Sequence, residues 1–325
     1  MDFDCLHCRF ARREPITAPG ATLGDLLKEA PPGLRTLAPG PVYDWLCQVK
    51  LHDCVITTTN GHALSSARGN TARWTRIHLD AHPATQRLTL SPAGPSGGHA
   101  VFTPRYEALR GLDALHFYGS DDRLSHRIIF GSHGTGALLG RLRETPVAIA
   151  EQAPPADAST RVDQTLGHVL EARRTWDHMG PAGHLEHVQL NQGTDRLSAL
   201  PHMGYDRARR IEHTCLPHWL NQLLTHGMVY TRVVIGDGWS QADGSEVSKL
   251  STDAGHLLVH STLGIVSLDF GNLGSCWETH FNHRGSRFSF LELYSGCGQC
   301  MAVLAPYRDY LQDHWGSLTG GLPDR

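Results

Sequence analysis

The chain has 325 residues, of which 40% are hydrophobic and 19% charged, a composition typical of a globular protein with room for two domains. The formal net charge of −3 provides no basic field for nucleic acid or an anionic membrane, so neither partner is expected. No apolar run is long enough to span a membrane, and the opening MDFDCLHCRFARREP lacks the apolar core of a signal peptide. We therefore expect a cytoplasmic protein with mostly reduced cysteines.

Predicted elements follow one another in a clear order along the chain. Residues 1–40 are rich in Pro and Gly, with one short amphipathic segment, LGDLLKEA. From about residue 51, runs of β-forming residues separated by turn dipeptides predict several strands. The low-complexity stretch EQAPPADAS at 151–159 predicts a linker, and the region after it has helical periodicity, as in PHWLNQLLTHG. Strands are predicted again from Met228, and YRDYLQDHWGSL predicts a final short helix.

The two β regions resemble each other. CVITTTNGHALSSARG aligns with RVVIGDGWSQADGSEV, which places Asn60-Gly61 on Asp237-Gly238. ALHFYGSDDRLSHRIIF aligns with FLELYSGCGQCMAVLA, which places Phe117-Tyr118 on Leu293-Tyr294. Both matches have an offset close to 176 residues and occur in the same order, which indicates an internal duplication.

The duplication predicts an α+β fold with two domains, each a large antiparallel β-sheet with flanking helices. We place the first domain, with an irregular N-terminal arm, at residues 1–150 and the linker at 151–159. The second domain then spans 160–325.

The second half resembles the HemS/ChuS family of heme-handling proteins, which consist of two such tandem repeats. The similarity extends from Met228 to the end through VVIGDGWSQADGSEV, GSCWETHFNHRGSRF, SFLELYSGCGQCMAVL and DHWGSL, and more loosely into the first half through VITTTNGHA. The resemblance implies a cytoplasmic protein that binds or traffics heme in heme-iron utilisation, with a heme-uptake or heme-oxygenase protein as a further partner. In some members of the family the heme macrocycle is opened oxidatively.

Two positions depart from the family pattern. The resemblance places an axial heme ligand, a His, thirteen residues before Arg207, where this chain has Thr194. A family Arg in the first repeat is replaced by Thr59. A hydroxyl is a weak donor to ferric heme compared with a neutral imidazole, so the resemblance leaves enzymatic activity undecided. The alternative is a non-enzymatic paralogue that has lost heme and acts as a scaffold or sensor, with a structural zinc as an added option.

Other residues could replace the missing contacts. His184 and His187 in GHLEHVQL precede Thr194, and His202 follows it, so His187 and His202 flank the expected ligand position. The alternative is that these histidines are ordinary exposed polar residues. Four histidines and one arginine are therefore our candidates for binding heme: His187, His202, His280, His283 and Arg207.

His280 and His283 occupy the place where the family has basic residues. Either could contact a heme propionate, or the two together could coordinate a small metal ion at spacing i, i+3. The alternative is again that they bind nothing.

Four cysteines form two Cys-x-x-Cys pairs, Cys5 with Cys8 and Cys297 with Cys300. Together they have the ligand count of a structural zinc site, which would attach the N-terminal arm to the second domain. Free thiols or a disulfide are the alternatives. The first-half counterpart of SGCGQC is GSDDRLS, so we expect CGQC to form the tip of a β-hairpin, with Gly298 in the turn.

Overall fold

The computed structural model describes residues 22–29, 33–37, 42, 46, 54–68, 72–74, 87–92, 98–106, 109, 111–131, 139–142, 173–189, 194–283, 285–307 and 311–325. The predicted linker at 151–159 and both N-terminal cysteines lie outside these residues. No helix among the described residues is long and apolar enough to cross a membrane.

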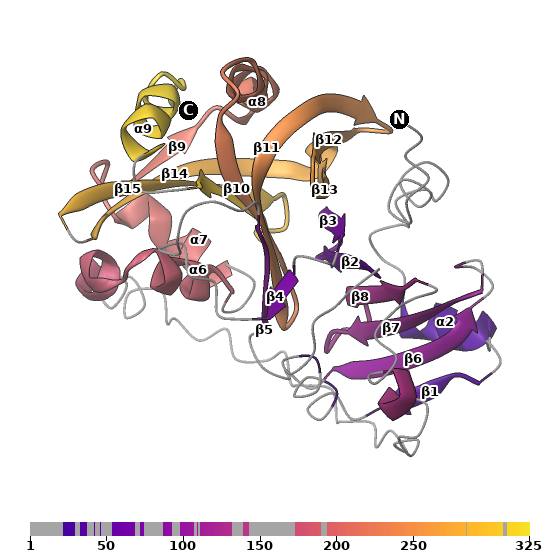
Figure 1. The fold of residues 1–325 in the computed structure, drawn as a ribbon. Helices are drawn as coiled ribbons and strands as arrows, with labels where there is room; N and C mark the ends of the chain where they lie inside the picture. The colour runs from indigo at the N-terminus through magenta and orange to yellow at the C-terminus, as the bar shows by residue number, and fades with distance from the viewer. Residues whose placement is uncertain are drawn as a thin grey trace.

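Strands dominate the described structure (Figure 1). The strands are β1 (Arg35–Leu37), β2 (Cys54–Thr59), β3 (Ala63–Arg68), β4 (Ala72–Trp74), β5 (Arg87–Pro92), β6 (His99–Tyr106), β7 (Leu112–Tyr118), β8 (Leu124–Phe130), β9 (Ala208–Ile211), β10 (Val229–Gly236), β11 (Trp239–Asp253), β12 (His256–Ser261), β13 (Gly264–Asp269), β14 (Leu273–His283), β15 (Ser286–Ser295) and β16 (Cys300–Pro306). The α-helices are α2 (Leu23–Glu29), α6 (Pro181–Gln189), α7 (Thr194–Ala199), α8 (Leu216–Thr225) and α9 (Gln312–Gly320). The 3₁₀ turns are η3 (Trp176–His178), η5 (Leu200–His202), η6 (His213–Cys215) and η7 (Phe270–Asn272).

The strand order shows the duplication directly. The first half is arranged β1-β6-β7-β8-β2-β3, and the second half is arranged β9-β14-β15-β16-β10-β11, so each strand has a counterpart at the same place. The pairings are antiparallel, apart from a short parallel pair between β4 and β5. The predicted fold, two copies of an α+β unit with a large antiparallel sheet, is confirmed.

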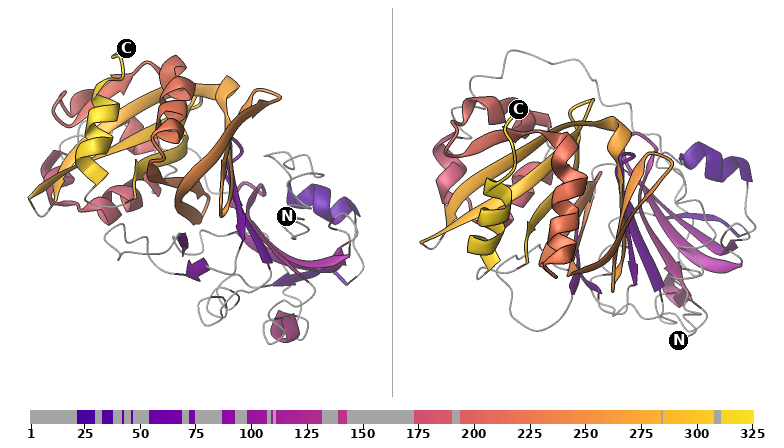
Figure 2. Two further views of the ribbon diagram at one scale, coloured as in Figure 1. Left: turned by 45° about the horizontal axis from the view of Figure 1, so that its top comes forward. Right: turned by 90° about the horizontal axis from the view of Figure 1, so that it is seen from above.

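The two copies exchange strands at their boundary. Strand β13 of the second copy pairs with β3 of the first, while β5 of the first copy pairs with β11 of the second. At the β3–β13 pairing, a Cβ added to Gly264 would lie 2.0 Å from the backbone oxygen of Ser66, so only glycine permits this close approach. Figure 2 shows the purple strands of the first copy beside the orange strands of the second.

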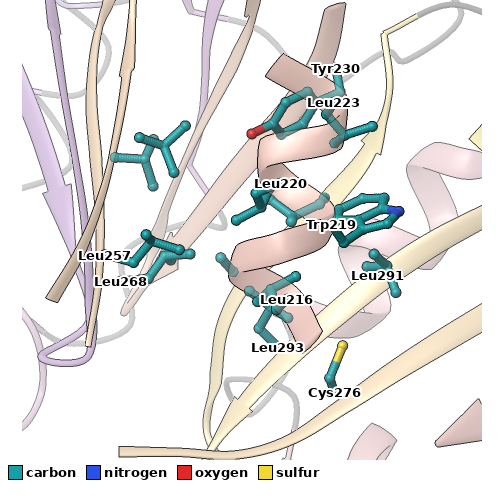
Figure 3. Packing of buried hydrophobic residues seen from close by; sticks show 14 of the residues in the cluster. Leu216, Trp219, Leu220, Leu223, Tyr230, Leu257, Leu268, Cys276, Leu291 and Leu293 are labelled. Atoms are coloured by element: carbon teal, nitrogen blue, oxygen red, sulfur yellow. The ribbon is translucent and has the colours of Figure 1, made fainter. Parts of the chain in front are cut away.

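Helices cover both faces of the second sheet (Figure 1). On one face, α8 presents Leu216, Trp219, Leu220 and Leu223 to the sheet residues Leu291 and Leu293, as Figure 3 shows. This is the helical face that the spacing of its leucines predicts. On the other face, η3, α6 and α7 pack on side chains of β14 and β15, including Phe281 and Phe290. The second sheet is therefore buried on both faces.

Candidate functional site

The helical layer formed by η3, α6, α7 and η5 contains the position where the resemblance places a heme ligand. Thr194 is the first residue of α7. Trp176, Leu185 and Leu200 of this layer are buried against Trp277 and the aromatic residues of the sheet. The polar side chains beneath the layer therefore decide whether a ligand fits there.

A buried ion pair links α7 to the sheet. The side chains of Arg196 and Glu292 are both 0% exposed, and the guanidinium donates from Nε to Oε2 at 2.7 Å and from Nη2 to Oε1 at 2.5 Å. The hydroxyls of Thr279 and Tyr294 donate to the same carboxylate at 2.6 and 2.7 Å. Burial raises the pKa of Glu292, but the charge and hydrogen bonds of Arg196 outweigh burial and hold that pKa below its ordinary value. Protein groups, rather than a ligand, satisfy the polar atoms here.

His184 belongs to the same buried layer. Its Nε2 lies 3.0 Å from the backbone oxygen of Trp176, and its Nδ1 lies 3.3 Å from Nη1 of Arg196. The imidazole stacks on Phe281, with ring centroids 3.9 Å apart. Burial and the charge of Arg196 lower the pKa of His184 well below its ordinary value, so the ring is neutral. Both ring nitrogens are occupied, which leaves His184 a packing role rather than a ligand role.

His187 and His202 lie on either side of α7 in the chain. His187 is in the last turn of α6 and partly exposed, while His202 ends η5 and is exposed. His202 thus lies at the outer side of the helical layer, whereas the Nδ1 of His187 is buried and its ring lies close enough to His184 for the two imidazoles to interact electrostatically. Replacement of the axial ligand by either one stays a prediction.

The cation of Arg207 already has two carboxylate partners. Its Nη2 donates to Asp177 at 2.8 Å and its Nη1 donates to Asp206 at 3.1 Å. The hydrogen bond to Asp177 raises the pKa of Arg207. A heme propionate would therefore have to compete with Asp177 for this guanidinium.

The structure does not bring His280 and His283 together. Side chains alternate between the two faces of a strand, so residues three apart on β14 point to opposite sides. His280 lies on the α9 side, with its Nε2 3.5 Å from Oε2 of Glu278. His283 lies on the α6 side, where its ring occupies the space that a side chain on Gly180 would need. The two imidazoles cannot share one small metal ion.

A pocket of about 630 Å³ lies between α9 and the β14–β15 hairpin. This size is within the range of about 300–1,000 Å³ that is usual for ligand sites. Its lining includes Tyr205, Arg209, Glu278, His280 and Arg287. Arg209 is held by Glu278 and, at 2.8 Å, by Asp324. Within the described residues, the hydrogen bond of Arg287 is a long one of 3.4 Å to the backbone oxygen of Asp206.

The pocket suits an anionic ligand group at one end. Among the described residues, His280 is the predicted heme-contact residue that lines it, and the exposed cation of Arg287 projects from the next strand. An imidazole and a guanidinium are the groups that a heme carboxylate would contact. The pocket lies on the α9 side of the sheet, across from α6 and α7, so a carboxylate bound here would not belong to a heme ligated at position 194.

The cysteines of the hairpin tip have opposite environments. Cys297 is exposed, whereas Cys300 is buried in the core, and burial raises the pKa of its thiol well above the ordinary value. Within the described part of the chain, no three His, Cys, Asp or Glu side chains are arranged to hold a metal ion. Cys5 and Cys8 lie outside that part, so the described residues give zinc no support. The predicted hairpin tip between β15 and β16 is confirmed.

Comparisons with known proteins identify the fold. No family model and no curated protein sequence matches the chain. Among solved structures, holo-PhuS, a heme-binding protein from Pseudomonas aeruginosa, matches with a TM-score of 0.70 and 16% identity over 90% of this chain and 87% of that chain. Apo-PhuS matches with a TM-score of 0.69 and 15% identity over 90% of this chain and 87% of that chain. ChuS, an E. coli heme oxygenase, matches with a TM-score of 0.69 and 17% identity over 90% of this chain and 89% of that chain. The chain has the fold of PhuS and ChuS.

The likeness to PhuS and ChuS confirms the architecture implied by the HemS/ChuS resemblance. Identities of 15% to 17% show the fold and leave the ligand chemistry to the side chains of this chain. The Arg196–Glu292 network was not foreseen from the sequence. Its signal is the Glu within SFLELYS, because a carboxylate in an otherwise apolar strand needs a buried partner.

Proposed function

We propose that the chain is a cytoplasmic carrier that binds heme or a related tetrapyrrole. The observation that carries the proposal is the match to heme-binding PhuS over nearly the whole of both chains. Within this proposal His187 or His202 supplies the axial imidazole. Arg207 and His283, which lie on the same α6 side of the sheet, contact the propionates. His280 lies on the opposite, α9 side, so it is not assigned to this heme. When bound, the heme would supply the iron that an imidazole ligates. Because Thr194 and Thr59 replace two family contacts, the proposal is transport rather than oxidative degradation.

Hemin titration of the purified protein, followed at the Soret band, tests the proposal. We expect a saturable shift that His187→Ala or His202→Ala alters, because the iron would lose its imidazole. His218→Ala is the matched control, since His218 is an exposed histidine on α8. A shift that is not saturable, or that survives the double substitution of His187 and His202 unchanged, contradicts the ligand assignment.

The packing beneath α7 favours a second candidate, a paralogue that has lost heme. The Arg196–Glu292 pair and His184 fill the space between α7 and the sheet with satisfied protein groups. A Thr194→His variant separates the candidates, because it restores an imidazole at the family position. If wild type and Thr194→His both fail to shift the Soret band, the chain is a scaffold or sensor that does not bind heme.

A further inference from the structure

The CGQC turn touches the other copy of the duplicated fold. It follows β15 and lies against the β2–β3 turn of the first copy, which contains Asn60 and His62. The side-chain amide of Asn60 donates to the backbone oxygens of Cys300 at 3.0 Å and Met301 at 2.9 Å. A third contact, to the oxygen of Ile235 at 2.8 Å, ties the same amide to β10. The two turns are therefore held in fixed register.

Two hydrogen-bonding groups converge on the exposed sulfur of Cys297. Its Sγ lies 3.5 Å from Nε2 of His62 and 3.0 Å from the hydroxyl of Ser295. Ser295 is only 3% exposed, and its oxygen already accepts the backbone N–H of Gln299 at 3.2 Å. That bond leaves the Ser295 proton free to point at the sulfur.

The imidazole of His62 also directs a ring nitrogen, Nε2, at the sulfur of Cys297. Its Nδ1 is buried and has no hydrogen-bond partner within the described residues. A proton on that atom would be unsatisfied, so the neutral ring carries its proton on Nε2, which faces the sulfur. A thiol is a weak acceptor, whereas a thiolate accepts strongly, so the two groups are placed to hydrogen-bond the sulfur of a reacting thiolate.

The first copy contains the same turn without this chemistry. In both copies two backbone hydrogen bonds close the hairpin turn. In the first copy, the N–H of Gly119 donates to the oxygen of Arg123 at 2.8 Å, and the N–H of Asp122 donates to the oxygen of Gly119 at 3.1 Å. In the second, Ser295 N bonds Gln299 O and Gly298 N bonds Ser295 O, both at 2.9 Å. Asp122 and Gly298 both have positive φ, 59° and 88°. Superposing the turns places Asp121 on Cys297.

We propose that Cys297, with His62 and Ser295, is a reactive thiol site that takes small disulfides by thiol–disulfide exchange. The Cys297 thiolate attacks one sulfur of the disulfide, a new S–S bond forms, and the original S–S bond breaks. The second thiolate leaves and takes up the proton that Cys297 lost. The incoming disulfide is the oxidant, so the step needs neither heme nor another reagent.

Cys300 does not complete the reaction as the second thiol of a redox pair. Its side chain is 0% exposed, and its Sγ lies 3.7 Å from the backbone oxygen of Ala302. Burial keeps this thiol protonated, and an intramolecular disulfide would require its side chain to leave the core. The product is therefore a stable mixed disulfide on Cys297.

Stopped-flow reaction of the full chain with 5,5′-dithiobis(2-nitrobenzoate), with peptide mapping of the modified cysteine, tests the proposal. We expect a fast phase that maps to Cys297, is absent from Cys297→Ser and is kept in Cys300→Ser. Loss of either donor, in His62→Leu or Ser295→Ala, slows that phase by about three- to tenfold at pH 7, because the reacting sulfur loses one of its two hydrogen bonds.

The matched control moves the thiol to the sister turn. Asp121→Cys with Arg123→Ala in a Cys297→Ser background has an exposed thiol in the same turn. Arg123→Ala removes the guanidinium that lies 3.7 Å from Asp121, and the imidazole at this turn, His99, contacts Asp122 rather than Asp121. We expect this control to react more slowly at pH 7 than wild-type Cys297. Equal rates for the two thiols, or unchanged rates in both His62→Leu and Ser295→Ala, overturn the proposal. A mapped Cys297–Cys300 disulfide overturns the assignment of Cys300. Unchanged thermal unfolding midpoints exclude misfolding as the cause.

Discussion

Replacing Arg196 by Met tests whether the buried ion pair holds α7 on the sheet. Methionine keeps most of the apolar stem of the arginine, which packs with its guanidinium 4.5 Å from the ring centre of Trp176. The substitution leaves the carboxylate of Glu292 buried with only the hydroxyls of Thr279 and Tyr294 as donors. Breaking one side of a buried pair costs about 3–5 kcal/mol, because the remaining charge is uncompensated.

A double-mutant cycle separates the pair from simple packing. Glu292→Gln in the Arg196→Met background removes the second charge and keeps an oxygen for the two hydroxyls. We therefore expect the double variant to cost less than the sum of the single variants by about 2–3 kcal/mol. Arg287→Met is the control, since this exposed arginine has one long contact and should change stability by less than about 0.5 kcal/mol.

Urea unfolding followed by tryptophan fluorescence measures these values at pH 7. The pH dependence adds an independent check, because the charge and hydrogen bonds of Arg196 hold the pKa of Glu292 in the folded state below its ordinary value of 4.5. The stability that ionised Glu292 contributes is fully present above the pKa of this side chain in the unfolded state. It is lost as the pH falls from that value through the lower pKa of the folded state. Wild type should therefore lose more stability than Arg196→Met below about pH 4.5. Additive single effects, or a cost of less than about 1 kcal/mol for Arg196→Met, refute the reasoning.

Two further predictions concern stability. Gly316→Ala should stabilise the protein by about 0.5–1 kcal/mol, because this helical position has open space for a Cβ. Gly264→Ala should destabilise the protein, because its Cβ would lie 2.0 Å from the backbone oxygen of Ser66. The midpoints of urea unfolding measure both changes. His116 and His126 are buried, and burial lowers their pKa to about 3, so stability should fall as the pH drops from 6.5, by up to about 1.4 kcal/mol per pH unit for each histidine. His126→Gln should flatten the dependence of the urea midpoint on pH between 7 and 5, and an unchanged slope contradicts the assignment.

Local sequence patterns predicted the repeated parts of the fold. The alignment of Asn60-Gly61 with Asp237-Gly238 locates equivalent hairpin turns, and the alignment of GSDDRLS with SGCGQC locates the other pair. Both predictions succeed because turn chemistry and strand alternation are encoded within a few residues. Alternation on WETHFNH also predicts opposite faces for His280 and His283, so the idea that the two share a metal ion was avoidable.

Contacts between distant segments were out of reach of such patterns. Arg196 and Glu292 are 96 positions apart, and Cys297 and His62 are 235 apart. Neither pair has a spacing signature, because each depends on how the sheet places its turns and on how the helical layer docks. The sequence identified the residue types that carry chemistry, but their partners followed only from the fold.

The duplication explains how a reactive turn could arise without loss of the fold. In the first copy, the β7–β8 turn is fixed to the second copy by the backbone N–H of Ser120, which donates to Asp237 at 2.8 Å. At the equivalent junction of the second copy, the donor is a side chain of the first copy: the amide of Asn60 donates to three backbone oxygens of the second copy. Because the latter contacts use no side chain of the CGQC turn, the side chain at position 297 is not needed to hold the junction. Chemistry at Cys297 can therefore vary independently of the architecture that the chain shares with PhuS and ChuS.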